Sequence, residues 1–171
     1  GRKIEYIVTD EKGDSTEAVN AYNALMDQEI VALIGDVTSK PCKAVAAKAA
    51  ADNMPMLTPS GTDADITKAG KNVFRACFID PFQGTMLARY AVKNDYKKIA
   101  IMREKDSEYA VGLVKYFQDE IATHDGFEVV ELCDFMNKDE DFSALLGAVL
   151  AQSPDVIFTS VSYADKAAQI M

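Results

Sequence analysis

Strand-like and helix-like segments alternate along the whole sequence, and this alternation constrains the fold more than any other feature. Short runs of β-branched and aromatic residues predict strands, and the stretches between them carry apolar residues at helical spacing. Strands joined by helices in this way form parallel sheets with helices on both faces, so that apolar strands such as 30–34 and 99–102 are buried. The sequence therefore predicts an α/β fold with strands over 3–9, 30–34, 55–57, 72–78, 98–102, 128–132 and 155–160.

Capping signals mark where two of the predicted helices begin. Asp14 precedes Glu17 by three residues, a spacing typical of a capping box. Asp80 followed by Pro81 indicates a second helix start, with the aspartate as the cap. Further helices are expected over 41–53, 106–123 and 139–151 and from Tyr163 onward.

Composition and charge exclude several classes of function. The 171 residues are 49% hydrophobic and 26% charged, with 18 basic and 27 acidic side chains and a net charge of -9. This balance indicates a globular chain without the basic surface that nucleic acid requires. Three widely spaced cysteines and a single histidine predict neither a disulfide framework nor a zinc site. No apolar run reaches the roughly 18 residues that span a bilayer.

Catalytic motifs do not stand out. A Ser-His-acid arrangement would have to use His124, which ends a predicted helix and is expected at the amino edge of a sheet, away from Ser39. We interpret His124 as a surface or C-capping histidine. The sequence lacks the glycine-rich phosphate loops, and its acidic stretch at 134–141 does not match a calcium loop. We therefore expect no enzyme, no metal and no cofactor.

Hydroxyl-bearing loops follow two of the predicted strands. Ligands of parallel sheets bind beyond the carboxyl ends of the strands, where Ser39 and Thr62 each stand at a predicted helix start and Gly61 allows close approach of the backbone. Two such helix starts can hold a carboxylate without Arg or Lys. The alternative is that Ser39 and Thr62 only cap their helices. In the second half of the chain, Tyr109 and Tyr163 follow strands and are either core residues or covers for a ligand.

A series of segments resembles a known receptor family in order and spacing over essentially the whole chain. The segments are KIEYIVTDEKGD, EAVNAYNAL, ALIGDVTS, PMLTPSGT, NVFRACFIDPFQG, KKIAIM, YAVGL, DFSALL and PDVIFT. In this order they resemble the branched-chain amino-acid receptors of ABC transporters, which are type I periplasmic binding proteins.

The resemblance implies a fold and a mechanism. Two Rossmann-like three-layer lobes with parallel sheets would close around a small amino acid, branched-chain or related, and deliver it to a membrane permease. The lobes would be residues 1–79 and 80–171, both partial, because members of the family are about twice as long. The implied location is extracytoplasmic, periplasmic or lipid-anchored, and the implied partners are the ligand and the permease.

The resemblance also assigns roles to individual residues. Ser39 and Thr62 match the hydroxyls that bind the ligand carboxylate, and Ser60 and Gly61 match the loop whose backbone meets the ligand. The other matching positions are Val37 and Thr38 in the side-chain pocket and Tyr109, Ser162 and Tyr163 in the second lobe.

One departure concerns the last of these positions. Ser162 stands where the family often has a second aromatic residue, which leaves the identity of the ligand open. Three alternatives remain at this point: the effector-binding core of a transcription regulator, a sensor ectodomain of the same fold, and a small flavodoxin-like enzyme.

Overall fold

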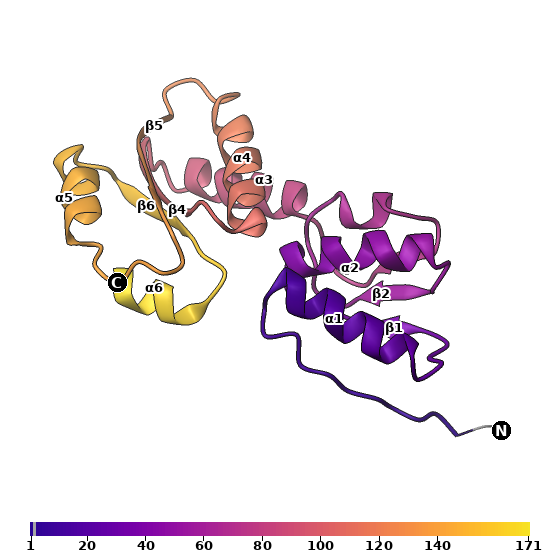
Figure 1. Ribbon diagram of the computed structural model, residues 1–171. Helices are drawn as coiled ribbons and strands as arrows, with labels where there is room; N and C mark the ends of the chain where they lie inside the picture. Colours follow the sequence, from indigo (N-terminus) through magenta and orange to yellow (C-terminus); the bar gives the residue numbers. More distant parts are fainter. Residues whose placement is uncertain (2) are drawn as a thin grey trace. The chain divides into compact units, whose positions relative to one another are not determined.

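The computed structural model describes Gly1 and residues 3–171, which divide into two compact units, Gly1–Cys77 and Phe78–Met171 (Figure 1). The boundary expected from the sequence, between Ile79 and Asp80, lies slightly farther along. Each unit contains a three-stranded parallel sheet with helical connections, which confirms the α/β class.

The first unit orders its strands β1-β2-β3. Its first helix begins where the sequence predicts, because the Asp14 carboxylate accepts hydrogen bonds from the backbone N–H groups of Thr16 and Glu17 at 2.8 and 3.0 Å. The elements are α1 (Ser15–Met26), β1 (Leu33–Ile34), α2 (Ser39–Ala51), β2 (Met56–Thr58), a 3-10 helix η1 (Ile66–Lys68) and β3 (Val73–Arg75).

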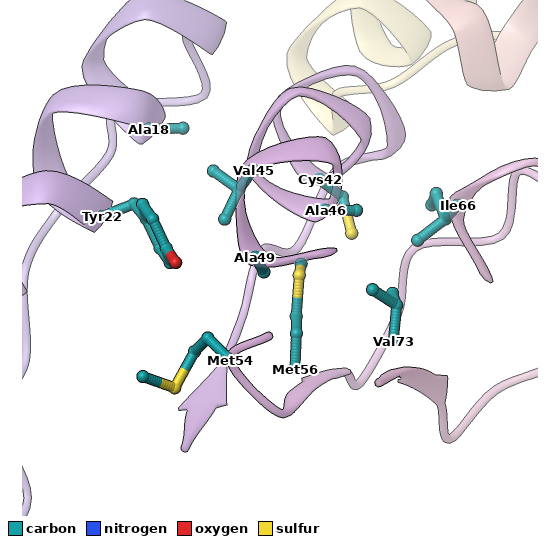
Figure 2. Close-up of a cluster of buried hydrophobic side chains, with 10 residues drawn as sticks. All are labelled: Ala18, Tyr22, Cys42, Val45, Ala46, Ala49, Met54, Met56, Ile66 and Val73. Carbon is teal, nitrogen blue, oxygen red and sulfur yellow. The ribbon is translucent and has the colours of Figure 1, made fainter. Parts of the chain in front are cut away.

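The core of this unit lies between α1, α2 and the inner face of the sheet (Figure 2). Tyr22 of α1 is buried, and its hydroxyl donates to the Asp52 carboxylate at 2.8 Å. Burial beside that carboxylate raises the pKa of Tyr22 to about 12. The other buried members of this core are Ala18, Cys42, Val45, Ala46, Ala49, Met54, Met56, Ile66 and Val73.

The outer face of the same sheet carries an apolar row. Ile34, Leu57 and Phe74 are register partners on neighbouring strands, and Ile34 and Phe74 are 68% and 54% exposed. The described helices of this unit pack on the opposite face. This unit therefore has two layers within the described residues, where three were expected.

Three strand predictions are wrong at least in part. The strand expected over 72–78 is shortened to β3 (Val73–Arg75). Residues 3–9 are not a strand, because no neighbouring strand among the described residues offers them hydrogen bonds; Ile4, Tyr6 and Val8 are exposed. The strand expected over 30–34 is reduced to β1 and is not buried, because β1 is an edge strand that pairs only with β2 among the described residues. A local pattern predicts an extended backbone, whereas pairing depends on distant residues.

The second unit orders its strands β5-β4-β6. Its strands begin where the sequence predicts, give or take a residue. Two of its helices start later than predicted, because residues 106–107 and 139–142 are not helical. The elements are α3 (Asp80–Lys93), β4 (Lys98–Glu104), α4 (Glu108–Ile121), β5 (Glu128–Phe135), α5 (Ser143–Ala151), β6 (Val156–Ser160) and α6 (Ala164–Ile170).

Helices cover both faces of this sheet, as predicted. Alternate residues of the central strand β4 face opposite layers: Ile99 and Ile101 pack against α3 and α4, and Ala100 and Met102 pack on the side of α5 and α6. The strand segment 99–102 is fully buried, which confirms that expectation.

One helix cap differs from its prediction. Ile79, not Asp80, is the N-cap of α3; Asp80 is the first helical residue and is buried.

Among the described residues, no helix combines the length and the apolar character that crossing a membrane requires.

Helices α3 and α4 approach closely at Gly84, and this contact is testable. A Cβ atom at Gly84 would lie 2.7 Å from the Leu113 carbonyl oxygen and 2.9 Å from the Phe117 nitrogen. We expect Gly84→Ala to lower the free energy of unfolding by about 1–3 kcal/mol, because backbone atoms have to move apart. The control is Gly147→Ala in α5, where nothing lies within 4 Å; that change should stabilise by about 0.5–1 kcal/mol. Equal effects in urea unfolding would contradict the close contact.

Candidate functional site

Two loops meet at the carboxyl edge of the first sheet. They follow β1 and β2, and the buried Thr58 at the end of β2 connects them. The Thr58 hydroxyl donates to the Asp36 carbonyl at 2.9 Å and accepts from the Gly61 backbone N–H at 2.9 Å. One side chain thus fixes the spacing of both loops.

Two further hydrogen bonds bring the predicted residues of this unit together. The Ser60 hydroxyl donates to the Val37 carbonyl at 2.9 Å, and the Ser39 hydroxyl accepts from the Asp63 backbone N–H at 3.3 Å. Lys43 forms an ion pair with the Asp63 carboxylate at 3.2 Å. The six positions predicted in this half of the chain therefore lie in one pair of joined loops: Val37, Thr38, Ser39, Ser60, Gly61 and Thr62.

Neither hydroxyl proposed to bind a carboxylate caps a helix. The N-cap of α2 is Thr38, which makes no side-chain capping bond, and Ser39 is the first helical residue. The N-cap of η1 is Asp65, so Thr62 is not a cap either. Because the Ser39 oxygen accepts from Asp63, its proton is left to donate. Within the described part of the chain, neither the hydroxyl nor the backbone N–H of Thr62 has a hydrogen-bond partner.

Gly61 has a packing reason to be glycine. A Cβ atom there would lie 2.8 Å from both Ile66 Cδ1 and Thr58 Oγ1 and 3.1 Å from Cys42 Sγ. The backbone therefore passes tightly over the core at this point. The expected reason, close approach to a ligand, stays a prediction.

Asp36 is the most perturbed acid of this edge. Burial, together with the negative charge of Glu11, raises the pKa of Asp36 to about 6. The Oδ2 atom of Asp36 is buried without a hydrogen-bond partner, as is one carboxylate oxygen of Glu11. Ionised Asp36 is therefore a cost to the folded state.

In the second unit, Tyr109 lies in the first turn of α4 and is held by α3. Its hydroxyl accepts a hydrogen bond from the Gln83 side-chain amide at 2.9 Å, which leaves the phenolic proton free to donate. Burial raises the pKa of Tyr109, so the phenol stays protonated at neutral pH.

Ser162 belongs to a polar network at the carboxyl edge of the second sheet. Its backbone N–H donates to the Glu104 carboxylate at 2.6 Å, and its hydroxyl donates to Ser107 Oγ at 2.6 Å. Glu104 is 2% exposed and ends the central strand β4. Tyr163 follows as the N-cap of α6 and is 39% exposed. The loop is thus fixed by a buried acid.

The comparison with known families settles what kind of chain this is. A family model described as periplasmic binding protein matches residues 1–170. The chain belongs to the periplasmic binding protein family. The resemblance stated from the sequence is confirmed at this level.

Relatives of this periplasmic binding protein chain include proteins named for branched-chain amino acids. The chain is 32% identical over 161 residues to the Leu/Ile/Val-binding protein BraC3 of Rhizobium johnstonii, covering 92% of this chain and 43% of the relative. It is 30% identical over 160 residues to a Leu/Ile/Val-binding protein homolog of Brucella melitensis, with the same coverage. The chain therefore spans less than half the length of these relatives.

Solved structures agree with these sequence relatives. A leucine binding protein, LivK, from Thermotoga maritima superposes with a TM-score of 0.92 at 33% identity, covering 99% of this chain and 48% of that one. The LivJ protein from Streptococcus pneumoniae, solved with isoleucine, superposes with a TM-score of 0.90 at 29% identity and the same coverage. The type I periplasmic binding protein fold is thereby confirmed.

In each of the two units, the structure adds residues that the sequence analysis missed. Thr58, Arg75 and Gln83 hold predicted site residues in place, and Glu104 holds Ser162. Their signal in the sequence is weak, because a polar residue at a strand end or in a helix is common. Glu104 and Thr58 differ from other polar residues at strand ends only in being buried.

His124 lies where the sequence predicts. It follows α4 at the amino side of the second sheet, and its Nε2 lies 3.4 Å from the Glu120 carboxylate. Its ring also packs edge-on against Phe127. These contacts are those of a surface histidine beside a helix end.

The raised pKa of Asp36 predicts a pH-dependent stability. Its folded pKa is raised from 3.8 to about 6, so the destabilisation is absent below pH 4 and complete above pH 6. Asp36→Asn should therefore raise the free energy of unfolding at pH 7 by about 1 kcal/mol, less than the full shift implies because the side chain is only partly buried. Urea unfolding at pH 4 to 7 measures this gain, which should vanish at pH 4. Asp119→Asn, an exposed control, should show no such trend; a gain independent of pH would refute the assignment.

Proposed function

We propose that this chain is part of an extracytoplasmic receptor that binds a small amino acid, branched-chain or related, for an ABC transporter. The observation that carries the proposal is the pair of joined loops, in which Ser39 and Thr62 keep hydroxyl protons free at the carboxyl edge of the sheet. Together with the open N-terminus of α2, these donors suit a carboxylate. The names of the relatives support an amino acid as the ligand that bears this carboxylate.

The two units are proposed to be the partial lobes of this receptor, residues 1–79 and 80–171. The first lobe contributes Ser39, Ser60, Gly61 and Thr62 toward the carboxylate and ammonium groups, and Val37 and Thr38 toward the ligand side chain. The second contributes Tyr109, Ser162 and Tyr163. A ligand that contacts both lobes favours the closed arrangement, because only that arrangement gains both sets of contacts.

The remaining parts of the proposal follow from the same role. The receptor would act outside the cytoplasm, in the periplasm or anchored by lipid, and would deliver its ligand to a membrane permease. It would not be an enzyme, since binding and release need no bond to be made or broken. Nucleic acid is not a proposed partner, given the net charge of -9.

The carboxylate is the part of the ligand that the site defines best. Solved structures of this fold from Rhodopseudomonas palustris contain benzoate or 4-hydroxybenzoate, which are carboxylates as well. A binding screen of the full-length protein should therefore include the twenty amino acids and benzoate. We expect a branched-chain amino acid to bind more tightly than benzoate.

Removing the two free hydroxyls tests the carboxylate contact. A hydrogen bond to a charged group contributes about 1.5–3 kcal/mol, so Ser39→Ala and Thr62→Val should each weaken amino-acid binding about 10- to 150-fold. Thr123→Val is the control, because this exposed hydroxyl bonds to the Glu120 carbonyl at the opposite edge of its sheet. Calorimetric titration beside melting curves measures both quantities. Affinity that holds while stability drops would assign these hydroxyls to structure alone.

Substitution of His124 tests the proposal that the protein is not an enzyme. Because His124 lies on the amino side of its sheet, His124→Ala should leave amino-acid affinity within about 0.5 kcal/mol of the wild type. Calorimetric titration is again the measurement. A tenfold loss would place His124 at a working site and would favour an enzyme.

A further inference from the structure

Arg75 donates hydrogen bonds to the backbone of the loop that carries Thr62. It is the last residue of β3 and the register partner of Thr58, so its side chain reaches the segment that follows β2. Its Nη1 donates to the carbonyl oxygens of Gly61 and Asp63, the latter at 2.8 Å, and its Nη2 reaches Thr67 Oγ1 at 3.5 Å. All three acceptors are neutral, so the guanidinium serves here as a planar fork for backbone carbonyls.

Holding a carbonyl fixes the direction of the neighbouring N–H group. In a planar trans peptide, the C=O of one residue and the N–H of the next point in opposite directions. With the Gly61 and Asp63 carbonyls turned to Arg75, the N–H groups of Thr62 and Ala64 point away from the guanidinium. Neither N–H donates a hydrogen bond within the described residues.

Three other N–H groups of this loop are already occupied, and that of Ser60 has no partner among the described residues. The Gly61 N–H donates to Thr58 Oγ1, the Asp63 N–H to Ser39 Oγ and the Asp65 N–H to the Asp63 carboxylate. The loop thus alternates occupied and free donors. A positive charge at the carbonyl end of a peptide also polarises it, which strengthens the free N–H as a donor.

We propose that Arg75 is a positioning residue that orients the Thr62 and Ala64 N–H groups toward the ligand carboxylate. The inference rests on the proposed function, because it takes the amino acid as the occupant of this edge. It extends the site beyond the hydroxyls to a side chain that never touches the ligand. The role suits arginine, because the single ammonium of lysine cannot hold two carbonyls and a hydroxyl in one plane.

The test compares a ligand that has the carboxylate with one that lacks it. L-leucine and L-leucinamide are titrated into the full-length protein, its Arg75→Met and Arg75→Lys variants, and an Arg89→Met control. Arg89 is an exposed arginine paired with Glu120 in the second unit. We expect Arg75→Met to weaken L-leucine about 10- to 100-fold and L-leucinamide less than about threefold. The L-leucine affinity of Arg75→Lys should lie between those of Arg75→Met and the wild type. Arg89→Met should bind as the wild type does.

A second readout needs no ligand. In amide NMR spectra of the ligand-free protein, both Arg75 variants should shift the Thr62 and Ala64 resonances, and Val129 in the second sheet should not move. Arg75→Lys keeps the charge and serves if Arg75→Met does not fold.

The possible failures are distinguishable. An equal loss of L-leucine and L-leucinamide affinity, or unmoved Thr62 and Ala64 resonances, would overturn the positioning role. A wild type that binds neither L-leucine nor another amino acid would overturn the proposed function, while the amide resonances would still decide whether Arg75 orients the loop.

Discussion

Parallel pairing of β2 with its two neighbours is the interaction on which the candidate site depends. The register aligns Ile34 with Leu57 and Thr58 with Arg75, so the segments after β1 and β2 and the end of β3 arrive at one edge. Without that register, Thr58 could not reach the Asp36 carbonyl, nor Arg75 the Gly61 carbonyl. The strands are short, and their alignment is secured by the buried core between the sheet and the helices α1 and α2.

Much of the fold could be predicted from the sequence because its signals are local. The cap at Asp14, the buried run 99–102 and the alternation of elements each depend on residues close together in the chain. The strand expected over 3–9 fails for the opposite reason, since a strand needs a partner that local pattern does not supply. The exposed β1 fails similarly: its apolar composition is that of a buried strand, but its position in the sheet is an edge.

The candidate site shows the same division. Ser39 and Thr62 could be selected from their place after strands, but their hydrogen bonds could not. That Ser39 accepts from Asp63, rather than capping α2, depends on a contact between two loops 24 residues apart. The sequence could not reveal the roles of Thr58 and Arg75. Both lie in strands of three residues, which are too short for an alternating pattern to show which side chains face inward. Glu104 was missed because a carboxylate at a strand end gives no sign of burial until the Ser162 loop is placed.

The chemistry of the first loop pair follows from where its charges are directed. Lys43 forms an ion pair with Asp63, and Arg75 faces carbonyl oxygens, so these two cations stabilise the loop itself. The groups proposed to meet a carboxylate are neutral: two hydroxyls and backbone N–H groups. Neutral donors held in place lose little hydration when a ligand arrives, and they do not retain an anion as a desolvated ion pair would. In the proposed receptor, which has to release its ligand, specificity would come from the fixed direction of the donors and not from a strong charge–charge attraction.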